Sequence, residues 1–351
     1  MNKFIKKLCL LLPIPINLVM VNYFVDPGNV FYKHGYYEKG IASILSKETN
    51  VENLSNYDER LLQKFYIDKL EKTKRIVVLG SSRAMQITEK VLKEEDMFNS
   101  SVSGASLEDL MAIYGVYKKE NKLPKKVVIG LDPWILNKNN NQSRWKSLKE
   151  YYFYMQGEIG LHNGDKEKFD EKYLELVSLS YFQTAVDTLA KKENIAYAST
   201  DKEYSKTNVK RADGSLAYNE EFRSRSVEEV RKLALQYASE EPVYNLGDFA
   251  TIDEVYKENF EEFIALMLKD GVEVEFYLSP YHPYVYEKLI SSADYRIVDE
   301  VERYFVGFAK NKDIKLNGSY NPSKVGCIEE DFYDGMHIKP SGVEKIFKNR
   351  F

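Results

Sequence analysis

The sequence predicts an α/β fold: a doubly wound, mostly parallel sheet in three layers, with a large insertion and an N-terminal transmembrane helix. Three observations predict it. Short apolar segments rich in β-branched residues end at glycines or polar turns, and stretches suited to helices separate them. An apolar run also follows a cluster of lysines at the N-terminus. At 351 residues, the chain is long enough for one large domain that carries an insertion.

The N-terminal 25 residues are expected to anchor the chain in a membrane. Lys3, Lys6 and Lys7 precede an apolar run over Leu8–Val25, which spans roughly 27 Å as a helix, close to the hydrocarbon thickness of a bilayer. No small-x-small cleavage site precedes Asp26, which favours an uncleaved anchor. Lysines stay on the cytoplasmic side, so residues 26–351 are expected outside the membrane. The alternative is a buried helix of a soluble protein.

The remaining chain divides into a leading segment, residues 26–72, and an α/β domain, residues 73–351. The leading segment contains a turn at Asp26–Gly28 and a charged helical stretch over Asn56–Leu70. Within the domain, strands are expected at Arg75–Leu79, Met97–Val102, Lys126–Gly130, Val272–Leu278 and Asp313–Leu316. Helices are expected at residues 83–94, from Ser106 as cap to 121, at 252–269, at 284–310 and from Pro340 onward.

An insertion is expected at residues 135–245, where the alternation of strands and helices stops. This part is rich in Tyr, Lys, Glu and Asn, with helical stretches near Lys168–Ser178 and Val227–Glu240. Arg211–Ser215 contains Asp-Gly and is expected to be a turn. We expect the insertion to cover the functional site.

Four polar turns follow expected strands. They are Gly80-Ser81-Ser82, Ser103-Gly104-Ala105, Gly130-Leu131-Asp132 and Ser279-Pro280-Tyr281-His282. Ligands of doubly wound sheets bind beyond the carboxyl ends of the strands, so these turns predict a site on one rim. Ser81 and Ser82 are each also suited to be a helix N-cap.

An Asp334-x-x-His337 pair near the C-terminus provides a general base and a carboxylate, the two groups that Ser82 needs for acyl-transfer chemistry. A serine attacks, a histidine takes its proton and a carboxylate orients the imidazole. Asp331 is a rival to Asp334 as the orienting residue. The spacings of a P-loop, a Rossmann fingerprint and a G-x-S-x-G nucleophile elbow are absent from the sequence.

These motifs resemble the SGNH (GDSL-like) hydrolase superfamily over roughly residues 73–134 and 245–345. Gly80-Ser81-Ser82 has serine where that family has aspartate, which resembles the membrane-anchored branch with the D-alanyl-lipoteichoic acid transfer protein and the alginate O-acetylation proteins. The anchor, the turns at 211–215 and 279–282, and the closing block 334–342 resemble the same branch. The resemblance implies an SGNH/flavodoxin-like three-layer catalytic domain.

The resemblance also implies roles for individual residues. Ser82 matches the nucleophile, His337 the general base and Asp334 its partner, while the amides of Ser82 and Gly104 match oxyanion donors. The family's third donor is an asparagine, and Asp132 stands in its place. An ionised carboxylate repels an oxyanion, and a lost donor typically costs on the order of 100- to 1,000-fold in rate. The candidates to replace that donor are Asn99, Arg83 and His282, which stay unranked. Ser81 and Asp132 are further candidates for lining the site.

The expected function is therefore an extracytoplasmic serine acyltransferase or esterase for acetyl or D-alanyl groups. Its expected partners are a polysaccharide or teichoic-acid-like substrate, a membrane-bound O-acyltransferase and the membrane, with no cofactor or metal. The alternative is a catalytically decayed module of this fold that binds a polysaccharide or that partner. The net charge of −4 comes from 50 basic and 54 acidic side chains that are interspersed, which argues against nucleic acid. Trp134 and Trp145 are candidates for stacking on a sugar, or for the core.

Overall fold

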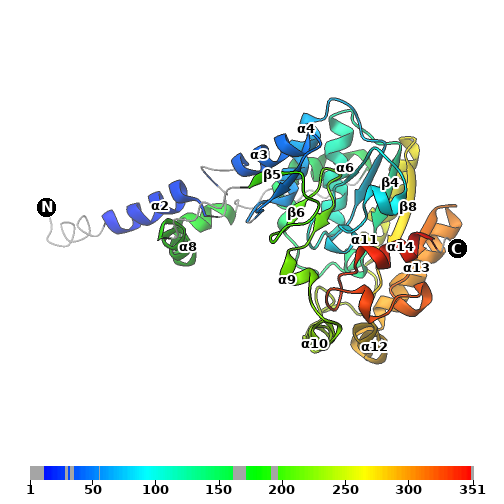
Figure 1. Ribbon diagram of the computed structural model, residues 1–351. Helices are drawn as coiled ribbons and strands as arrows, with labels where there is room; N and C mark the ends of the chain where they lie inside the picture. Colours follow the sequence, from blue (N-terminus) through cyan, green and yellow to red (C-terminus); the bar gives the residue numbers. More distant parts are fainter. Residues whose placement is uncertain are drawn as a thin grey trace.

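The computed structural model describes residues 12–27, 31, 35–54, 56–160, 171–190 and 197–348 (Figure 1). Its central element is a five-stranded sheet in which every strand pairs in parallel. The strands are β2 (Ile76–Leu79), β3 (Met97–Asn99), β4 (Lys126–Gly130), β8 (Glu273–Leu278) and β9 (Lys315–Gly318). Their order is β3-β2-β4-β8-β9, the 2-1-3-4-5 order of flavodoxin-like sheets. The predicted α/β class with a parallel sheet is confirmed.

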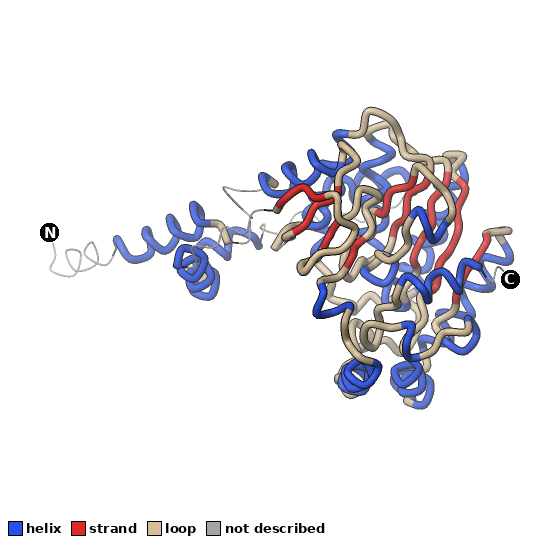
Figure 2. The backbone as a smooth tube through the Cα atoms, in the orientation of Figure 1, coloured by secondary structure: helices blue, strands red, loops and turns tan. Residues whose placement is uncertain are grey.

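Helices cover both faces of this sheet (Figure 2). Alternate residues of β2 point to opposite faces: Val77 and Leu79 join a large apolar cluster, and Ile76 and Val78 a smaller one. The larger cluster includes residues of α6 (Leu107–Lys119), α7 (Lys149–Glu158), α11 (Glu254–Lys269), α12 (Pro283–Ser291) and α13 (Ile297–Asn311). The smaller includes residues of α5 (Glu89–Leu92) and α14 (Pro340–Lys348).

A second, antiparallel sheet has the order β5-β1-β6-β7. Its strands are β1 (Asn50–Glu52), β5 (Ala198–Thr200), β6 (Val209–Lys210) and β7 (Leu216–Ala217). β1 belongs to the leading segment, whereas the other three belong to the predicted insertion. The two regions therefore share one sheet although about 150 residues separate them in the chain.

The hairpin of β6 and β7 carries the predicted turn at Arg211–Ser215, closed by a 2.9 Å hydrogen bond from the Arg211 amide to the Ser215 carbonyl. Gly214 has φ +75°, and a Cβ there would lie 2.6 Å from the Asn99 carbonyl oxygen. The turn therefore packs directly on the end of β3, and only glycine permits this approach.

Two further helices of the leading segment, α3 (Tyr36–Leu45) and α4 (Glu59–Lys69), pack against the α/β body. The N-cap of α4 is Asp58, whose carboxylate accepts the amides of Arg60 and Leu61. Arg60 then forms a two-pronged ion pair with Asp109 of α6, at 2.9 and 3.0 Å. Asp109 also completes the capping box with Ser106 that starts α6, as the sequence predicted for this helix start.

The remaining elements are short or lie in the predicted insertion. The α-helices are α2 (Pro13–Val25), α8 (Leu179–Ala190), α9 (Glu220–Arg223) and α10 (Val227–Ala238). The 3₁₀ turns are η1 (Ser82–Ala84), η2 (Pro133–Leu136), η3 (Arg144–Leu148), η4 (Glu171–Val177), η5 (Ala293–Tyr295), η6 (Pro322–Val325) and η7 (Glu329–Asp331). The predicted helix near Lys168–Ser178 lies partly outside the described residues, and its described part is η4.

Two of the predicted helices are wrong in extent. The stretch 83–94 is broken into η1 and α5 because the Asn99 side chain binds the carbonyls of Ala84 and Ile87, which a continuous helix would have used. Thr88 then caps α5. The stretch 284–310 is divided into α12 and α13, since Ser292 ends the first helix in an extended conformation and caps η5. β3 also ends three residues earlier than predicted, and β9 lies two residues later.

The N-terminal helix α2 lies beside α8, apart from the body that holds the two sheets (Figure 1). The buried Asn22 side chain joins α2 to η4 and the residue before α8, by donating to the carbonyls of Glu175, Leu176 and Ser178 at 2.9–3.1 Å. Residues 1–11 of the predicted anchor lie outside the described residues. Within the described part of the chain, no helix combines the length and the apolar character needed to cross a bilayer.

Candidate active site

Ser82 lies at the carboxyl end of β2, the strand beside which the order of the sheet reverses. It is the first residue of η1, and the Ser81 side chain caps this turn by accepting the Arg83 amide at 3.1 Å. Gly80 permits the arrangement, because a Cβ there would lie 2.8 Å from the Ala84 Cβ and 3.2 Å from Gly130. Of the two serines, Ser81 is therefore the N-cap and is buried, whereas Ser82 is partly exposed.

The predicted serine, histidine and aspartate form a continuous row of hydrogen bonds. The distance from Ser82 Oγ to His337 Nε2 is 2.9 Å, and that from His337 Nδ1 to Asp334 Oδ2 is 2.8 Å. Asp334 Oδ1 also accepts the amides of Met336 and His337, each at 2.8 Å. These contacts fix the carboxylate, which in turn orients the imidazole toward Ser82.

The electrostatics favour an ionised Asp334. Burial acts to raise the pKa of this carboxyl, but His337 and the amides of Met336 and His337 hold the pKa below its usual value. The rival, Asp331, has different partners: its carboxylate accepts the Ile328 amide at 2.9 Å and pairs with Lys345 at 2.6 Å. Asp334 is therefore the orienting residue of the row.

Asp132 is buried beside Arg83 rather than presented to the site as a free charge. Arg83 Nη1 lies 2.8 Å from Asp132 Oδ1, and both side chains are at most 3% exposed. The guanidinium also donates to the Ser279 and Met336 carbonyls and stacks 3.9 Å from the centre of the Tyr281 ring. Burial raises the pKa of Asp132, while Arg83 and the Ser81 side chain oppose that rise. The repulsion expected from the sequence is thus offset by a neighbouring cation.

Two backbone amides at the ends of β2 and β3, those of Ser82 and Gly104, are available to a ligand. The Val102 amide donates to the Gly80 carbonyl at 3.0 Å, which joins the end of β2 to the chain just before the Gly104 turn (residues 103–105). Gly104 in this turn has φ +55°, and Ser103 is fixed by Glu59 of α4, which accepts both its amide and its hydroxyl. Within the described part of the chain, the amides of Ser82 and Gly104 donate to no other group. They are the two amides to which the resemblance assigns the role of oxyanion donors.

The other candidates for lining the site have structural contacts. Asn99 is fully buried and uses its side chain on the carbonyls of Ala84 and Ile87 and on the Ser101 amide. His282 caps α12 by accepting the Tyr284 amide on Nδ1. Burial lowers the pKa of His282 to about 4, against the opposing effect of Glu329. The Asn99 side chain is therefore fully used in structural contacts. His282 uses only Nδ1 in this way, and its buried Nε2, 3.9 Å from Glu329, has no hydrogen-bond partner among the described residues.

Aromatic side chains from the predicted insertion pack on the imidazole of His337. The Tyr218 and Phe222 rings lie 5.7 and 6.2 Å from the His337 ring, and Tyr333 packs against both. The Tyr218 hydroxyl is buried and has no partner among the described residues. Sequence reasoning expected the insertion to cover the site but missed these residues; the abundance of tyrosine was the only signal.

The comparisons with known proteins leave the family open. No protein-family model matches the chain, and no curated protein is similar enough to count as a relative. The chemistry of this site is therefore argued from its geometry.

Proposed function

We propose that this protein is a serine-dependent acyltransferase or esterase that acts outside the membrane on hydroxyl groups of a cell-envelope polysaccharide or exopolysaccharide. The observation that carries the proposal is the row Ser82, His337 and Asp334, with contacts of 2.9 and 2.8 Å. Such a row is the arrangement that activates a serine hydroxyl. The resemblance to SGNH hydrolases supports the reaction class, and its membrane-anchored branch supports acetyl or D-alanyl as the acyl group.

The reaction proceeds in two steps. Ser82 Oγ attacks the carbonyl carbon of an acyl donor while His337 Nε2 takes the hydroxyl proton, and the amides of Ser82 and Gly104 stabilise the oxyanion. The donor's leaving group departs with the proton from His337, which leaves an ester on Ser82. In the second step, His337 removes the proton of a sugar hydroxyl or of water, whose oxygen attacks that ester. Ser82 then leaves and regains its proton from His337.

The alternative is a decayed module that binds a polysaccharide or a membrane-bound O-acyltransferase. The replacement of the family's asparagine by Asp132 motivated it. Because Arg83 pairs with Asp132 at 2.8 Å, the carboxylate is no longer an uncompensated charge beside the oxyanion. This contact favours the enzymatic proposal over the alternative.

A fluorophosphonate probe tests the proposal, since it reacts with activated serines. We expect the parent protein to be labelled, Ser82→Ala to lose labelling and 4-nitrophenyl acetate hydrolysis, and the control Ser323→Ala at an exposed serine to keep both. Asp334→Asn is expected to lower the turnover number by on the order of 1,000-fold or more, because it no longer stabilises the imidazolium. Equal labelling of Ser82→Ala and the parent would refute the nucleophile assignment.

A further inference from the structure

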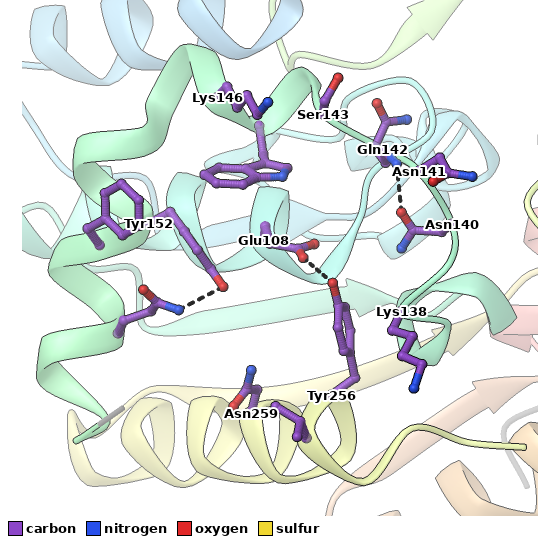
Figure 3. A pocket seen from close by; sticks show the side chains of 14 residues that line it. Glu108, Lys138, Asn140, Asn141, Gln142, Ser143, Lys146, Tyr152, Tyr256 and Asn259 are labelled. Carbon is purple, nitrogen blue, oxygen red and sulfur yellow. Dashed lines mark hydrogen bonds between the residues drawn. The ribbon is translucent and has the colours of Figure 1, made fainter. Parts of the chain in front are cut away.

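A hollow lies near the edge of the five-stranded sheet where the parallel strands have their carboxyl ends. It is separate from the row of Ser82, His337 and Asp334. Its volume is about 450 Å³, within the range of roughly 300–1,000 Å³ typical of small-ligand sites. Figure 3 shows its wall: the first turn of α6, the N-terminal half of α11, helix α7 and the loop that leads into η3. These elements begin or end near the rim where Ser82 lies, because α6 follows β3 and α11 precedes β8.

The wall combines aromatic rings with a polar atom that lacks a partner. Trp145 is partly exposed, and its ring centre lies 4.7 Å from that of Tyr152. Asn259, which Figure 3 shows on the α11 side of the hollow, is only 6% exposed, yet its Oδ1 has no hydrogen-bond donor among the described residues. A buried carbonyl oxygen without a donor is costly. A ligand hydroxyl or amide in the hollow satisfies it.

The hollow is lined by one acidic side chain, Glu108, and two basic ones, Lys138 and Lys146. Lys138 lies 3.3 Å from Asp253, so its charge is compensated. With Lys138 paired to an aspartate, the remaining charges are one of each sign, which favours an uncharged ligand. The carboxylate of Glu108 accepts the Tyr256 hydroxyl at 2.6 Å, and Gln156 donates to the Tyr152 hydroxyl at 2.9 Å (Figure 3). The side chains on this wall are thus held in place by one another, as in preformed sites with a few polar groups that fix a ligand's orientation.

One side chain contacts both the hollow and the Gly104 turn. Gln142, which lines the hollow, donates through Nε2 to the Gly104 carbonyl at 2.9 Å. Its Oε1 accepts from Arg144 Nε at 2.9 Å. A Cβ on Gly104 would collide with the Arg144 guanidinium. The loop between η2 and η3 therefore contacts both the turn that contains Gly104 and the hollow.

We propose that this hollow binds an uncharged pyranose unit of a glycan chain. Trp145 provides a flat apolar surface for the sugar face, and Asn259 Oδ1 and Glu108 accept its hydroxyls. The bound unit lies beside the one whose hydroxyl reacts at Ser82; this last step rests on the proposed function. The hollow thus determines which polymer is presented to the catalytic row.

Isothermal titration calorimetry with four uncharged tetrasaccharides tests the inference: cellotetraose, mannotetraose, maltotetraose and chitotetraose. We expect the full chain to bind at least one of them in the millimolar range or tighter, and Ser82→Ala to bind it equally well. Trp145→Ala and Asn259→Leu are expected to weaken binding at least about tenfold. Two variants serve as matched controls and are expected to keep binding within about threefold. Trp145→Phe keeps an aromatic face, and Tyr36→Ala removes an exposed ring in α3, which does not line the hollow.

Two results would overturn the inference: no binding of any of the four at about 10 mM, or binding within about twofold of the parent by both Trp145→Ala and Asn259→Leu. Fluorophosphonate labelling of the same proteins separates this outcome from a failure of the proposed function. Labelling at Ser82 without glycan binding would reject the hollow alone. Glycan binding that Trp145→Ala abolishes, without labelling at Ser82, would reject the enzyme alone.

Discussion

Arg83 is the residue that makes Asp132 compatible with an oxyanion site. A buried carboxylate without a partner is strongly disfavoured, and one beside a developing oxyanion also opposes the reaction. The guanidinium has a fixed fork of donors and cannot be deprotonated, so it compensates Asp132 while it holds the carbonyls of Ser279 and Met336. One buried cation thereby joins the ends of β2, β4 and β8 to the loop of His337.

The pair predicts a strong coupling between two substitutions. We expect Arg83→Met to lower the free energy of unfolding by about 3–5 kcal/mol, because it leaves Asp132 buried and uncompensated. The double variant Arg83→Met/Asp132→Asn is expected to be more stable than Arg83→Met alone, since the stranded charge is gone. Urea denaturation of the parent, both single variants and the double variant measures the coupling. Losses that simply add would show that the two side chains act independently.

His282 predicts a loss of stability on mild acidification. Its pKa is lowered to about 4 in the folded protein, whereas an unfolded histidine titrates near 6.5. The unfolded state therefore binds the proton more tightly. The stability that the folded protein gains by keeping His282 neutral is complete above about pH 6.5 and is lost as the pH falls toward 4. Between pH 7 and pH 5 the loss is on the order of 2 kcal/mol.

The matched variant for this prediction is His282→Asn, because asparagine keeps an N-cap acceptor for α12 without titrating. Urea unfolding at pH 7 and pH 5 should show a smaller acid-induced loss for His282→Asn than for the parent. If both proteins lose the same stability over this interval, protonation of other groups accounts for it.

The residues of the catalytic row were predictable because each lies in a short local motif. Ser82 follows a strand-ending glycine, and Asp334 and His337 share one loop, so the spacing itself indicates the chemistry. The partner of Asp132 was not predictable, because Arg83 reaches it from another strand end. Trp134 illustrates the same limit: it is fully buried and donates to the Ala105 carbonyl at 2.9 Å, so of the two candidate tryptophans only Trp145 remains available to a sugar.

At the scale of elements, the strands β2, β4 and β8 were predictable to within one residue from short segments rich in apolar and β-branched residues. The two broken helices were not, because their interruptions depend on a distant side chain, Asn99, and on a serine cap, Ser292. The pairing of β1 with β5 and β6 was also missed. Strands of two or three residues carry too little periodicity to be recognised, and their register is determined by tertiary contacts.

The missed pairing gives the leading segment a structural role that residue patterns did not indicate. β1 is an inner strand of the second sheet, between β5 and β6. Glu59 of α4 binds Ser103 in the Gly104 turn, and Arg60 pairs with Asp109 of α6. This segment therefore supports both the insertion and the position of the Gly104 amide.

We expect a chain of residues 35–351 to fold, and one of residues 73–351 to aggregate or lose cooperative unfolding. The shorter chain lacks α3, α4 and β1, which exposes the edges of β5 and β6 and the apolar residues beneath α4. Size-exclusion chromatography and thermal unfolding monitored by circular dichroism compare the two chains. A monomeric 73–351 chain that unfolds cooperatively and is labelled by the fluorophosphonate would contradict this prediction.

At the scale of the whole molecule, α2 and α8, which pack on each other apart from the body with the two sheets, carry exposed apolar side chains (Figure 1). Ile14 and Phe24 of α2 are 65% and 54% exposed, and Leu179 and Leu189 of α8 are 69% and 64% exposed. Exposed apolar side chains that gather in one patch mark contact with a membrane or a protein. The apolar run of the first 25 residues and its flanking lysines favour a membrane.

We therefore expect the full chain to sediment with membranes, resist extraction by alkaline carbonate and be released by detergent. A chain of residues 26–351 is expected to resist carbonate no longer, because it lacks the apolar run that the bilayer would retain. External protease added to intact cells should digest the α/β body of the full chain, since the lysines keep only the N-terminus inside. Recovery of the full chain in the carbonate supernatant would reject the anchor, and protection from protease would reject the orientation that places Ser82 beside an envelope polymer.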